Sequence, residues 1–469
     1  MLELIQSGKP LTLRQRLALT ARLSWPAIMA QLSSILMQYI DAAMVGRLGA
    51  VDSAAVGLVS TSLWLFWGVC SAATVGFSVQ VAHAMGAAEY DRARDIMRQG
   101  ILISFLFGVL IAVVGVSISQ VLPVWLGGEP EICAPASGYF LVFVSALPLL
   151  SLNYIGCGVL RAAGNMKVPG GLNVMMCALD VVFNFLLIFP TRDLTVFGTT
   201  FRMPGAGLGI WGAALGTVCA EIITAGSVIW YLLTKQEHLA LTKVKGKLKT
   251  LRISRDVSRK AIKVAAPMTL EHAVICGAQI MITVIVAPLG AIAITANAFA
   301  VTAEALCYMP GYGIGDAATT LTGQSYGAGR KDLARQFGYI TTLSGMVIMS
   351  AMGFMLWIFA PAVMSLMSPV QSIVDLGVEI LRIEAWAEPM FAASIVAYGA
   401  MVGVGDTIVP ACMNFMSIWL VRVPLAAILA PIMGLRGVWI AMCIELCFRG
   451  TIFLWRLIQG AWLKHGLKA

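Results

Sequence analysis

The stretch VAHAMGAAEYDRAR at residues 81–94 returns in altered form as TGQSYGAGRKDLAR at residues 322–335. Among the residues that keep their identity across a separation of 241 residues (327 − 86) are Gly86 with Gly327, Asp91 with Asp332, and Arg94 with Arg335. The same separation extends outward, without a gap, to Pro26 with Pro267, Leu48 with Leu289, Gly49 with Gly290, Gly164 with Gly405, Pro169 with Pro410, and Asn173 with Asn414. The chain is therefore predicted to consist of two homologous halves.

The composition indicates a membrane protein. Of the 469 residues, 59% are hydrophobic and 12% are charged, and the mean hydropathy is +0.86. A soluble protein is usually about 25% charged, so the chain is neither an ordinary soluble protein nor a disordered one. Its apolar runs of about 20 residues or more predict membrane-spanning helices rather than the alternating strands of a barrel.

Twelve spans are predicted, six in each half, at 17–45, 53–81, 97–122, 134–161, 168–189, 207–234, 260–286, 292–322, 337–366, 372–402, 408–431 and 437–460. Because six is an even number, the halves share one orientation and should be related by a pseudo-twofold axis along the membrane normal, as in many transporters. The predicted fold is an all-α polytopic membrane protein with two six-helix lobes. Most of 191–205 has no counterpart in the second half, and 190–206 is predicted to form an extracytoplasmic β-hairpin that turns near Phe197 and Gly198.

Lysine and arginine residues predict the orientation. Segment 235–260 holds nine of them, and others follow the second and eighth spans and lie near both termini, whereas the opposite loops carry only Arg47, Arg192, Arg202 and Arg436. Both termini are therefore expected in the cytoplasm, for a multi-pass protein of the inner (cytoplasmic) membrane. The expected divisions are a cytoplasmic lead at 1–16, a first lobe at 17–234, a basic cytoplasmic linker at 235–259, a second lobe at 260–460 and a cytoplasmic tail at 461–469.

Motifs for catalysis or cofactor binding are missing from the sequence. The ten cysteines and four histidines form no CxxC pair and no zinc-ligand spacing, so neither a disulfide framework nor a zinc site is expected. A nucleophile–base set and a P-loop are also missing, so we expect no enzyme activity, no cofactor and no ATP drive. The basic loops are interpreted as topology signals rather than as a nucleic-acid site.

Six segments, three in each half, resemble the multidrug and toxic compound extrusion (MATE) family. They are MVGRLGAVDSAAVG and VAPLGAIAITANAFA, the two stretches quoted above, and LRAAGNMKVPGGLN with MVGVGDTIVPACMN. The resemblance covers nearly the whole chain. It implies a twelve-helix, two-lobe exporter with a V-shaped central cavity, which exchanges an organic, often cationic, small molecule for Na⁺ or H⁺. We expect the protein to act as a monomer.

Acidic residues inside the predicted spans are candidates for function, because ionisable side chains are costly in hydrocarbon. The duplication provides a filter, since an acid that both halves need for packing should recur at the same separation in the other half. Seven acids have no acidic counterpart: Asp41, Asp180, Glu271, Glu304, Asp316, Glu384 and Glu388. Glu221 and Glu445 follow the insertion, where the separation is uncertain, and the filter does not judge them.

A site for the coupling cation is predicted in the first lobe. Gln31, Ser34, Gln38 and Asp41 form a polar stripe on the first span, and Asp180 and Asn184 stand one turn apart on the fifth. Their oxygens suit Na⁺, and a buried carboxyl group can instead take up a proton. The resemblance implies acids on these two spans, although the family's usual order of Asn and then Asp is exchanged here. The predicted site comprises Asp41, Asp180, Asn184 and Gln38, with a possible Na⁺ at Asp41 and Asp180.

A substrate site is predicted in the second lobe from six residues: Glu271, His272, Glu304, Asp316, Glu384 and Glu388. The resemblance implies carboxylates on spans seven, eight and ten for a cation or a cationic substrate. Structural roles remain open for several of these groups. Glu384 and Asp316 could form salt bridges with Arg382 or Arg422, and His272 could be a hydrogen-bonded core histidine. Glu445 could pair with Arg449 four residues away, and Glu221 could serve a helix contact.

Two other functions remain as alternatives to a cation-coupled antiporter. A lipid-linked saccharide flippase of related fold should have a cationic cavity for pyrophosphate and often has fourteen spans, whereas this chain has twelve and more intramembrane acids than bases. A receptor or polytopic enzyme is the other alternative, but no soluble domain or catalytic motif supports it.

Overall fold

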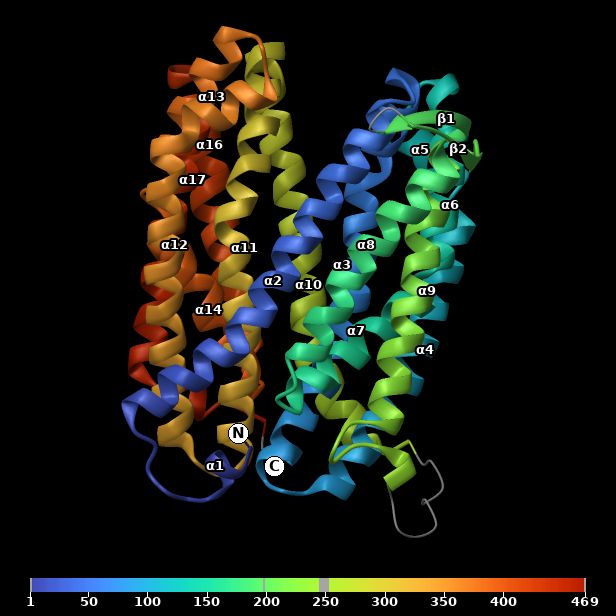
Figure 1. Ribbon diagram of the computed structural model, residues 1–469. Helices are drawn as coiled ribbons and strands as arrows, with labels where there is room; N and C mark the ends of the chain where they lie inside the picture. Colours follow the sequence, from blue (N-terminus) through green and yellow to red (C-terminus); the bar gives the residue numbers. More distant parts are fainter. Residues whose placement is uncertain (1, 197–198, 244–252, 468–469) are drawn as a thin grey trace.

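The computed structural model describes residues 2–196, 199–243 and 253–467, and most of the chain forms two helical bundles that lie side by side (Figure 1). The first half contains α2 (Leu13–Gly46), α3 (Ala50–Gly86), α4 (Tyr90–Ile118), α6 (Pro130–Ser145), α7 (Leu147–Ala162), α8 (Lys167–Ile188) and α9 (Ile210–Thr234). The second contains α10 (Arg255–Val286), α11 (Ala291–Gly327), α12 (Lys331–Met367), α13 (Gln371–Glu384), α14 (Glu388–Val404), α15 (Ile408–Met416), a π-helical turn η3 (Ser417–Arg422), α16 (Val423–Met433) and α17 (Leu435–Gln459). Short helices are α1 (Leu2–Gln6), α5 (Leu122–Trp125), η1 (Leu241–Lys243), η2 (Ala287–Leu289) and η4 (Ala461–Leu463).

The helices agree with the predicted spans in number but not in every boundary. Among the described residues, ten are long and apolar enough to cross a membrane, or up to twelve if each of two bent pairs is one span. The predicted spans 134–161 and 372–402 are these pairs: α6 and α7 meet at 44°, and α13 and α14 at 57°. Pro148 and Pro389 are the second residues of α7 and α14, and proline lacks the N–H that would continue the preceding helix.

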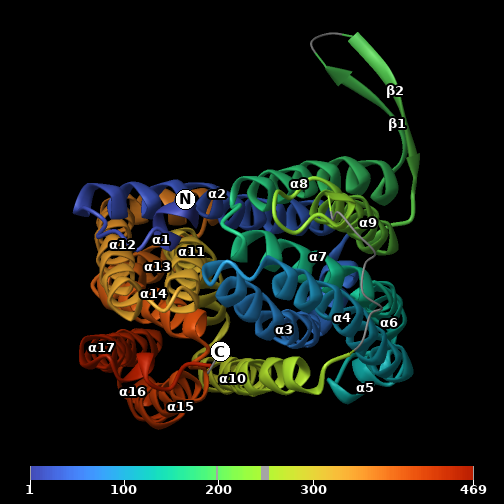
Figure 2. The ribbon, with the colours of Figure 1, turned by 90° about the horizontal axis from the view of Figure 1, so that it is seen from below.

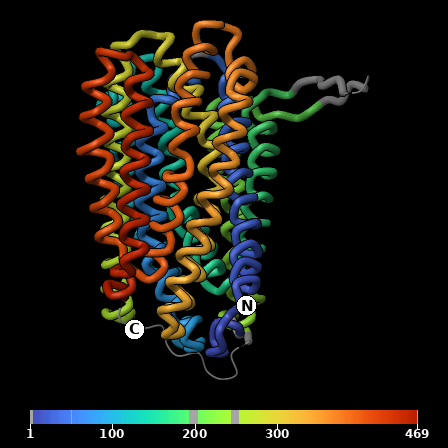
Figure 3. The backbone as a smooth tube through the Cα atoms, turned by 90° about the vertical axis from the view of Figure 1, so that its left-hand side faces the viewer, coloured from blue at the N-terminus to red at the C-terminus, as the bar shows by residue number. Residues whose placement is uncertain are grey.

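The helix boundaries repeat with the separation seen in the sequence. The starts of α3, α4, α6, α7 and α8 precede those of α11, α12, α13, α14 and α15 by that same separation. The last pair, α9 and α17, begins at Ile210 and Leu435, which lie closer together along the chain. The shortening is explained by the insertion, which forms the antiparallel strands β1 (Pro190–Val196) and β2 (Thr199–Ala206) in the first half. This hairpin projects away from the helices (Figure 3), and its predicted turn at 197–198 lies outside the described residues.

A close crossing of α3 and α11 explains the glycines of the duplicated stretch. A Cβ on Gly86 would lie 2.0 Å from the backbone oxygen of Gln324, and one on Gly327 would lie 2.1 Å from that of His83. His83 and Gln324 occupy equivalent positions in the repeat, so the two contacts are one contact viewed from each half. The pseudo-twofold axis therefore passes between these helices, and glycine allows them to approach this closely.

The same end of the molecule is closed by bonds between the halves. The ring Nε2 of His83 lies 2.9 Å from the backbone oxygen of Gly403, and Nε2 of Gln324 donates to the backbone oxygen of Ala162 over 2.7 Å. These two bonds are again equivalent under the repeat. Both chain termini lie at this end (Figure 1), which we call the terminal end.

The short helix α1 also joins the halves at the terminal end. Gln6 donates to the backbone oxygen of Met85 on α3 over 2.8 Å, and Arg330, which follows α11, donates to the backbone oxygen of Ile5 over 2.9 Å. Ile5 is fully buried between them. The predicted lead at 1–16 is thus packed into the closure through α1.

The first helix of each half extends toward the other bundle. Helix α2 packs on α8 of its own half and on α11 of the second, whereas α10 packs on α15 and on α3 of the first. The two helices lie on opposite sides of the molecule (Figure 2), as a twofold relationship requires. Large apolar side chains such as Leu366, which is 89% exposed, cover the outer surface, and such a surface suits contact with lipid.

Candidate functional site

Asp41, Asp180 and Asn184 come together between α2 and α8. The Nδ2 atom of Asn184 donates to Oδ1 of Asp41 over 2.8 Å and to Oδ2 of Asp180 over 3.0 Å. Asp180 and Asn184 are fully buried. Positions one turn apart share a helix face, so exchanging Asp and Asn between them keeps both side chains facing Asp41.

This cluster has free acceptor atoms. Oδ1 of Asp180 and Oδ1 of Asn184 have no hydrogen-bond partner among the described residues, although both are buried. The carboxyl groups of Asp41 and Asp180 also act on each other directly, and two like charges at such close range disfavour simultaneous ionisation. A proton or a small cation would relieve that repulsion. Gln38, the fourth residue predicted here, is exposed, and no hydrogen bond joins it to the cluster in the described part of the chain.

Two cavities lie between the bundles. The larger has a volume of about 590 Å³ and is lined mainly by first-half helices and by α11. The smaller, of about 430 Å³, is lined by α3, α10, α11 and α14, with residues of α7. Seven residues line both: Gly68, Ser71, Tyr154, Arg161, His272, Tyr312 and Asp316. At the place where the resemblance implies a central cavity, the structure therefore has two neighbouring cavities with a shared wall.

Two contacts between the halves form the boundary of these cavities. His272 on α10 has its Nε2 atom 3.1 Å from the backbone oxygen of Trp64 on α3. A Cβ on Gly68 would lie 1.8 Å from the His272 ring, so glycine makes this approach possible. Asp316 on α11 forms an ion pair of 2.8 Å with Arg161 on α7. The salt bridge considered for Asp316 is present, but the partner is Arg161 rather than Arg382 or Arg422.

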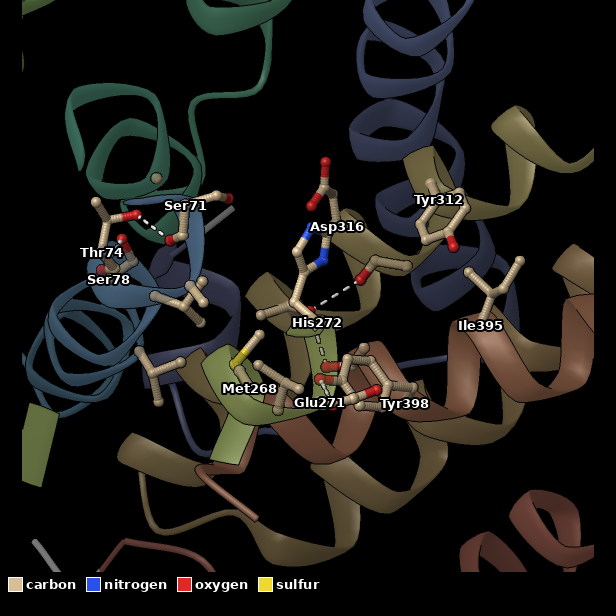
Figure 4. Close-up of a pocket in the computed structure, with 18 of the residues that line it drawn as sticks. Ser71, Thr74, Ser78, Met268, Glu271, His272, Tyr312, Asp316, Ile395 and Tyr398 are labelled. Atoms are coloured by element: carbon tan, nitrogen blue, oxygen red, sulfur yellow. Dashed lines mark hydrogen bonds between the residues drawn. The ribbon is translucent and has the colours of Figure 1, made fainter. Parts of the chain in front are cut away.

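Glu271 lines the smaller cavity through contacts within the second half. Its carboxylate accepts a 2.7 Å hydrogen bond from the Tyr398 hydroxyl (Figure 4) and a 2.5 Å hydrogen bond from Nδ2 of Asn414. Asn173, the repeat mate of Asn414, donates over 2.8 Å to the backbone oxygen of Ala30, which is the repeat mate of Glu271. Both halves therefore share the asparagine contact, and the second half adds a carboxylate to it.

Glu304, Glu384 and Glu388 form a separate acidic cluster. They act on one another electrostatically, and Glu384 and Glu388 are fully buried. None of the three lines either central cavity. No oxygen of Glu384 or Glu388 has a hydrogen-bond partner among the described residues, and the salt bridge considered for Glu384 is not found there. Direct contact of these three residues with a substrate remains a prediction, which their positions behind the cavity wall do not favour.

Two arginines lie close to this acidic cluster. Glu445 forms ion pairs with Arg422 at 2.9 Å and with Arg449 at 3.0 Å. The predicted pairing of Glu445 with Arg449 is therefore present. The Ser417 hydroxyl of the π-helical turn also donates to Glu445. Glu445 is thus neutralised within its own network.

A family model described as MatE matches the chain twice, at residues 26–186 and 267–428. The two matches begin at the equivalent prolines Pro26 and Pro267 and together cover more than half of the sequence. The chain belongs to the MatE family. The predicted resemblance is confirmed, and the family accounts for the duplication.

Curated and solved relatives of this MatE protein match almost end to end. The chain is 26% identical to the probable multidrug resistance protein NorM of Thermotoga maritima over 95% of this chain and 93% of the relative. It is 27% identical to the multidrug resistance protein NorM of Burkholderia vietnamiensis, over 96% of this chain and 95% of the relative. A crystal structure of MATE in complex with MaL6 superimposes with a TM-score of 0.87 at 21% identity, covering 99% of both chains. The predicted twelve-helix, two-lobe fold is thereby confirmed.

Several residues of the MatE cavities were not found from the sequence. Glu221 was left unjudged because the insertion changes the repeat separation. When the starts of α9 and α17 are aligned, the mate of Glu221 is Leu446 and the mate of Glu445 is Ala220. Both acids therefore lack an acidic counterpart. The comparison of intramembrane acids between the halves gives no signal for Arg161, because arginine is a base.

Proposed function

We propose that this MatE protein is a secondary antiporter that exports amphipathic organic cations in exchange for H⁺ or Na⁺. Relatives named as multidrug resistance proteins support the export of small molecules. The observation that carries the proposal is the buried group of Asp41, Asp180 and Asn184, with unpartnered oxygens, beside a cavity large enough for a drug-sized compound.

The proposed exchange uses the neighbouring carboxyl groups of Asp41 and Asp180, which act on each other. A coupling ion bound among Asp41, Asp180 and Asn184 neutralises the carboxylate pair and draws α2 and α8 together. An ion shifts a conformational equilibrium only when its affinity differs between the states. Helix α2 provides that difference, because it contacts both α8 and α11. The Tyr39 hydroxyl of α2 also donates to the backbone oxygen of Thr302 on α11.

The second-half acids are proposed to favour positively charged substrates. Glu271 lines the smaller cavity directly, and Asp316, which is paired with Arg161, lines both cavities beside His272. Glu304, Glu384 and Glu388 would act from behind the wall through their electric field, which is stronger in a poorly polarisable interior than in water.

The terminal end is proposed to face the cytoplasm, which places both termini and the basic linker there. The cluster of lysine and arginine residues at 235–260 supports this orientation in an inner membrane. The protein is proposed to act as a monomer, because residues of one chain line both cavities.

Export from inside-out vesicles under an imposed H⁺ or Na⁺ gradient tests the proposal. Uptake of a cationic dye should depend on one of the two gradients and should cease when that gradient is collapsed. Uptake that is insensitive to both gradients would contradict antiport.

A lipid-linked saccharide flippase is the weaker proposal. Its pyrophosphate would need unpaired basic residues, yet Arg161 in the shared boundary is neutralised by Asp316. Scrambling of a fluorescent lipid pyrophosphate in proteoliposomes without an ion gradient would favour the flippase.

A further inference from the structure

Glu221 is a buried carboxylate in the wall of the larger cavity. It lies near the middle of α9, is 3% exposed, and lines the cavity together with Thr217 and Val218 of the same helix. Asn153 of α7 lies close to it, but neither side-chain oxygen of Glu221 has a hydrogen-bond partner of normal geometry among the described residues. A buried charge without a partner is costly, so this side chain is expected to serve a bound group.

Helix packing does not explain the carboxylate. The repeat mate of Glu221 is Leu446, at the equivalent position of α17, and Leu446 is fully buried. An apolar side chain therefore fills this position in the second half. The acid is a property of the first-half cavity.

The charges around the larger cavity leave Glu221 uncompensated. The side chains of its lining that carry a formal charge are Glu221, Arg161 and Asp316. Arg161 is paired with Asp316 at 2.8 Å, so these two cancel. By formal charge, one negative group remains, and it is Glu221.

The rest of the lining suits an organic cation rather than a bare metal ion. Six aromatic residues surround the space: Trp64, Trp67, Phe143, Tyr154, Tyr308 and Tyr312. Aromatic faces attract organic cations, and the four methionines of the lining adapt to irregular shapes. A hard metal ion prefers six or so oxygen ligands, and no group of three or more His, Cys, Asp and Glu suited to a metal occurs in the described part of the chain.

We propose that Glu221 binds the positively charged group of an organic cation in the larger cavity and thereby sets the preference of this cavity for cations. The aromatic and methionine side chains hold the apolar body of the ligand. This inference rests on the proposed export function, because it names the residue that recognises the exported compound.

Binding of two matched dyes to the protein in lipid nanodiscs tests the inference without any ion gradient. One dye carries a trimethylammonium group, and the other carries a tert-butyl group of the same shape and no charge. Wild type should bind the cationic dye more tightly. Glu221→Gln should weaken binding of the cationic dye at least tenfold and change binding of the neutral dye less than twofold. Glu221→Asp, which keeps the charge, should restore part of the preference.

Two further variants keep the test decisive. Val218→Lys places an ammonium in the lining of the same cavity and should cause the same selective loss even if Glu221→Gln folds poorly. Glu379→Gln removes an outlying carboxylate that pairs with Arg436 and lines neither central cavity, so it should leave both dyes unaffected. Equal weakening of both dyes by Glu221→Gln, or no weakening of either, would overturn the inference. Failure of gradient-driven export with intact dye binding would instead contradict the proposed function.

Discussion

The side chain of Gln324 donates a 2.7 Å hydrogen bond to the backbone oxygen of Ala162, which joins α11 of the second half to α7 of the first. His83 is the repeat mate of Gln324, and Gly403 is the repeat mate of Ala162. The His83 ring contacts the backbone oxygen of Gly403 at 2.9 Å, so this bond joins the first half to the second. The pair of bonds closes the cavities at the terminal end. In the proposed antiporter, alternating access requires both bonds to break when that end opens.

Removing both bonds should loosen the terminal end. A hydrogen bond contributes about 1 kcal/mol, so the double variant His83→Ala/Gln324→Ala should raise the opening equilibrium by roughly fivefold per bond. Hydrogen–deuterium exchange should become faster at the ends of α3 and α11. Asn297→Ala removes the 2.9 Å bond to Trp439 within the second half and serves as the control. Equal rates of hydrogen–deuterium exchange at the terminal end in the double variant and in Asn297→Ala would contradict the role of these two bonds in closing that end.

Gly68→Ala should separate α3 from α10. Its Cβ would lie 1.8 Å from the ring of His272, whose Nε2 atom contacts Trp64. Overpacking of this kind costs about 1–3 kcal/mol, so thermal unfolding should occur at a lower temperature. Gly57→Ala is a matched control on the same helix, because a Cβ there meets nothing within 4 Å. Replacing His272 with alanine should rescue the Gly68 variant, and equal melting of the two glycine variants would contradict the account.

The ion pair between Arg161 and Asp316 should matter for charge in the cavity more than for stability. Both side chains are 31% exposed, and such pairs contribute about 1 kcal/mol or less. Asp316→Asn should fold normally but bind a cationic dye more weakly, because it leaves Arg161 unpaired. The exchange Arg161→Asp/Asp316→Arg should restore binding. Loss of binding in the exchanged protein would show that geometry matters rather than charge.

The sequence predicted the fold well because the duplication constrains it. The separation between Pro26 and Pro267 recurs in the helix boundaries. The bends before Pro148 and Pro389 follow from proline chemistry, although their angles depend on packing.

The site was predicted less completely. Asn184 bridges Asp41 and Asp180, and the spacing of one helical turn explains why Asp180 and Asn184 share a face of α8. The sequence did not reveal that Arg161 reaches Asp316, because that contact joins two helices from different halves of the chain. The sequence also did not predict that Glu304 and Glu388 lie outside the cavity lining. The helix on which a residue lies does not determine whether its side chain reaches the cavity.

Orientation can be tested in the linker. Lys245 lies outside the described residues, and its place in the basic segment 235–259 predicts a cytoplasmic position. A cysteine at Lys245, in a background without native cysteines, should react with an impermeant maleimide in inside-out vesicles and not in intact cells. Labelling of intact cells would reverse the topology.

Ion-coupled transport by variants of the two acidic clusters tests the central claim most directly. Proteoliposomes containing wild type, Asp41→Asn, Asp180→Asn or Glu388→Gln would be compared for uptake of the cationic and neutral dyes under the driving gradient. The account predicts that both aspartate variants fold, lose uptake of both dyes and lose dependence on ion concentration, because they remove the charge beside Asn184. Glu388→Gln should reduce uptake of the cationic dye alone and keep its ion dependence. Full coupled uptake by Asp41→Asn, or loss of ion dependence in Glu388→Gln alone, would contradict it and assign coupling to the second half.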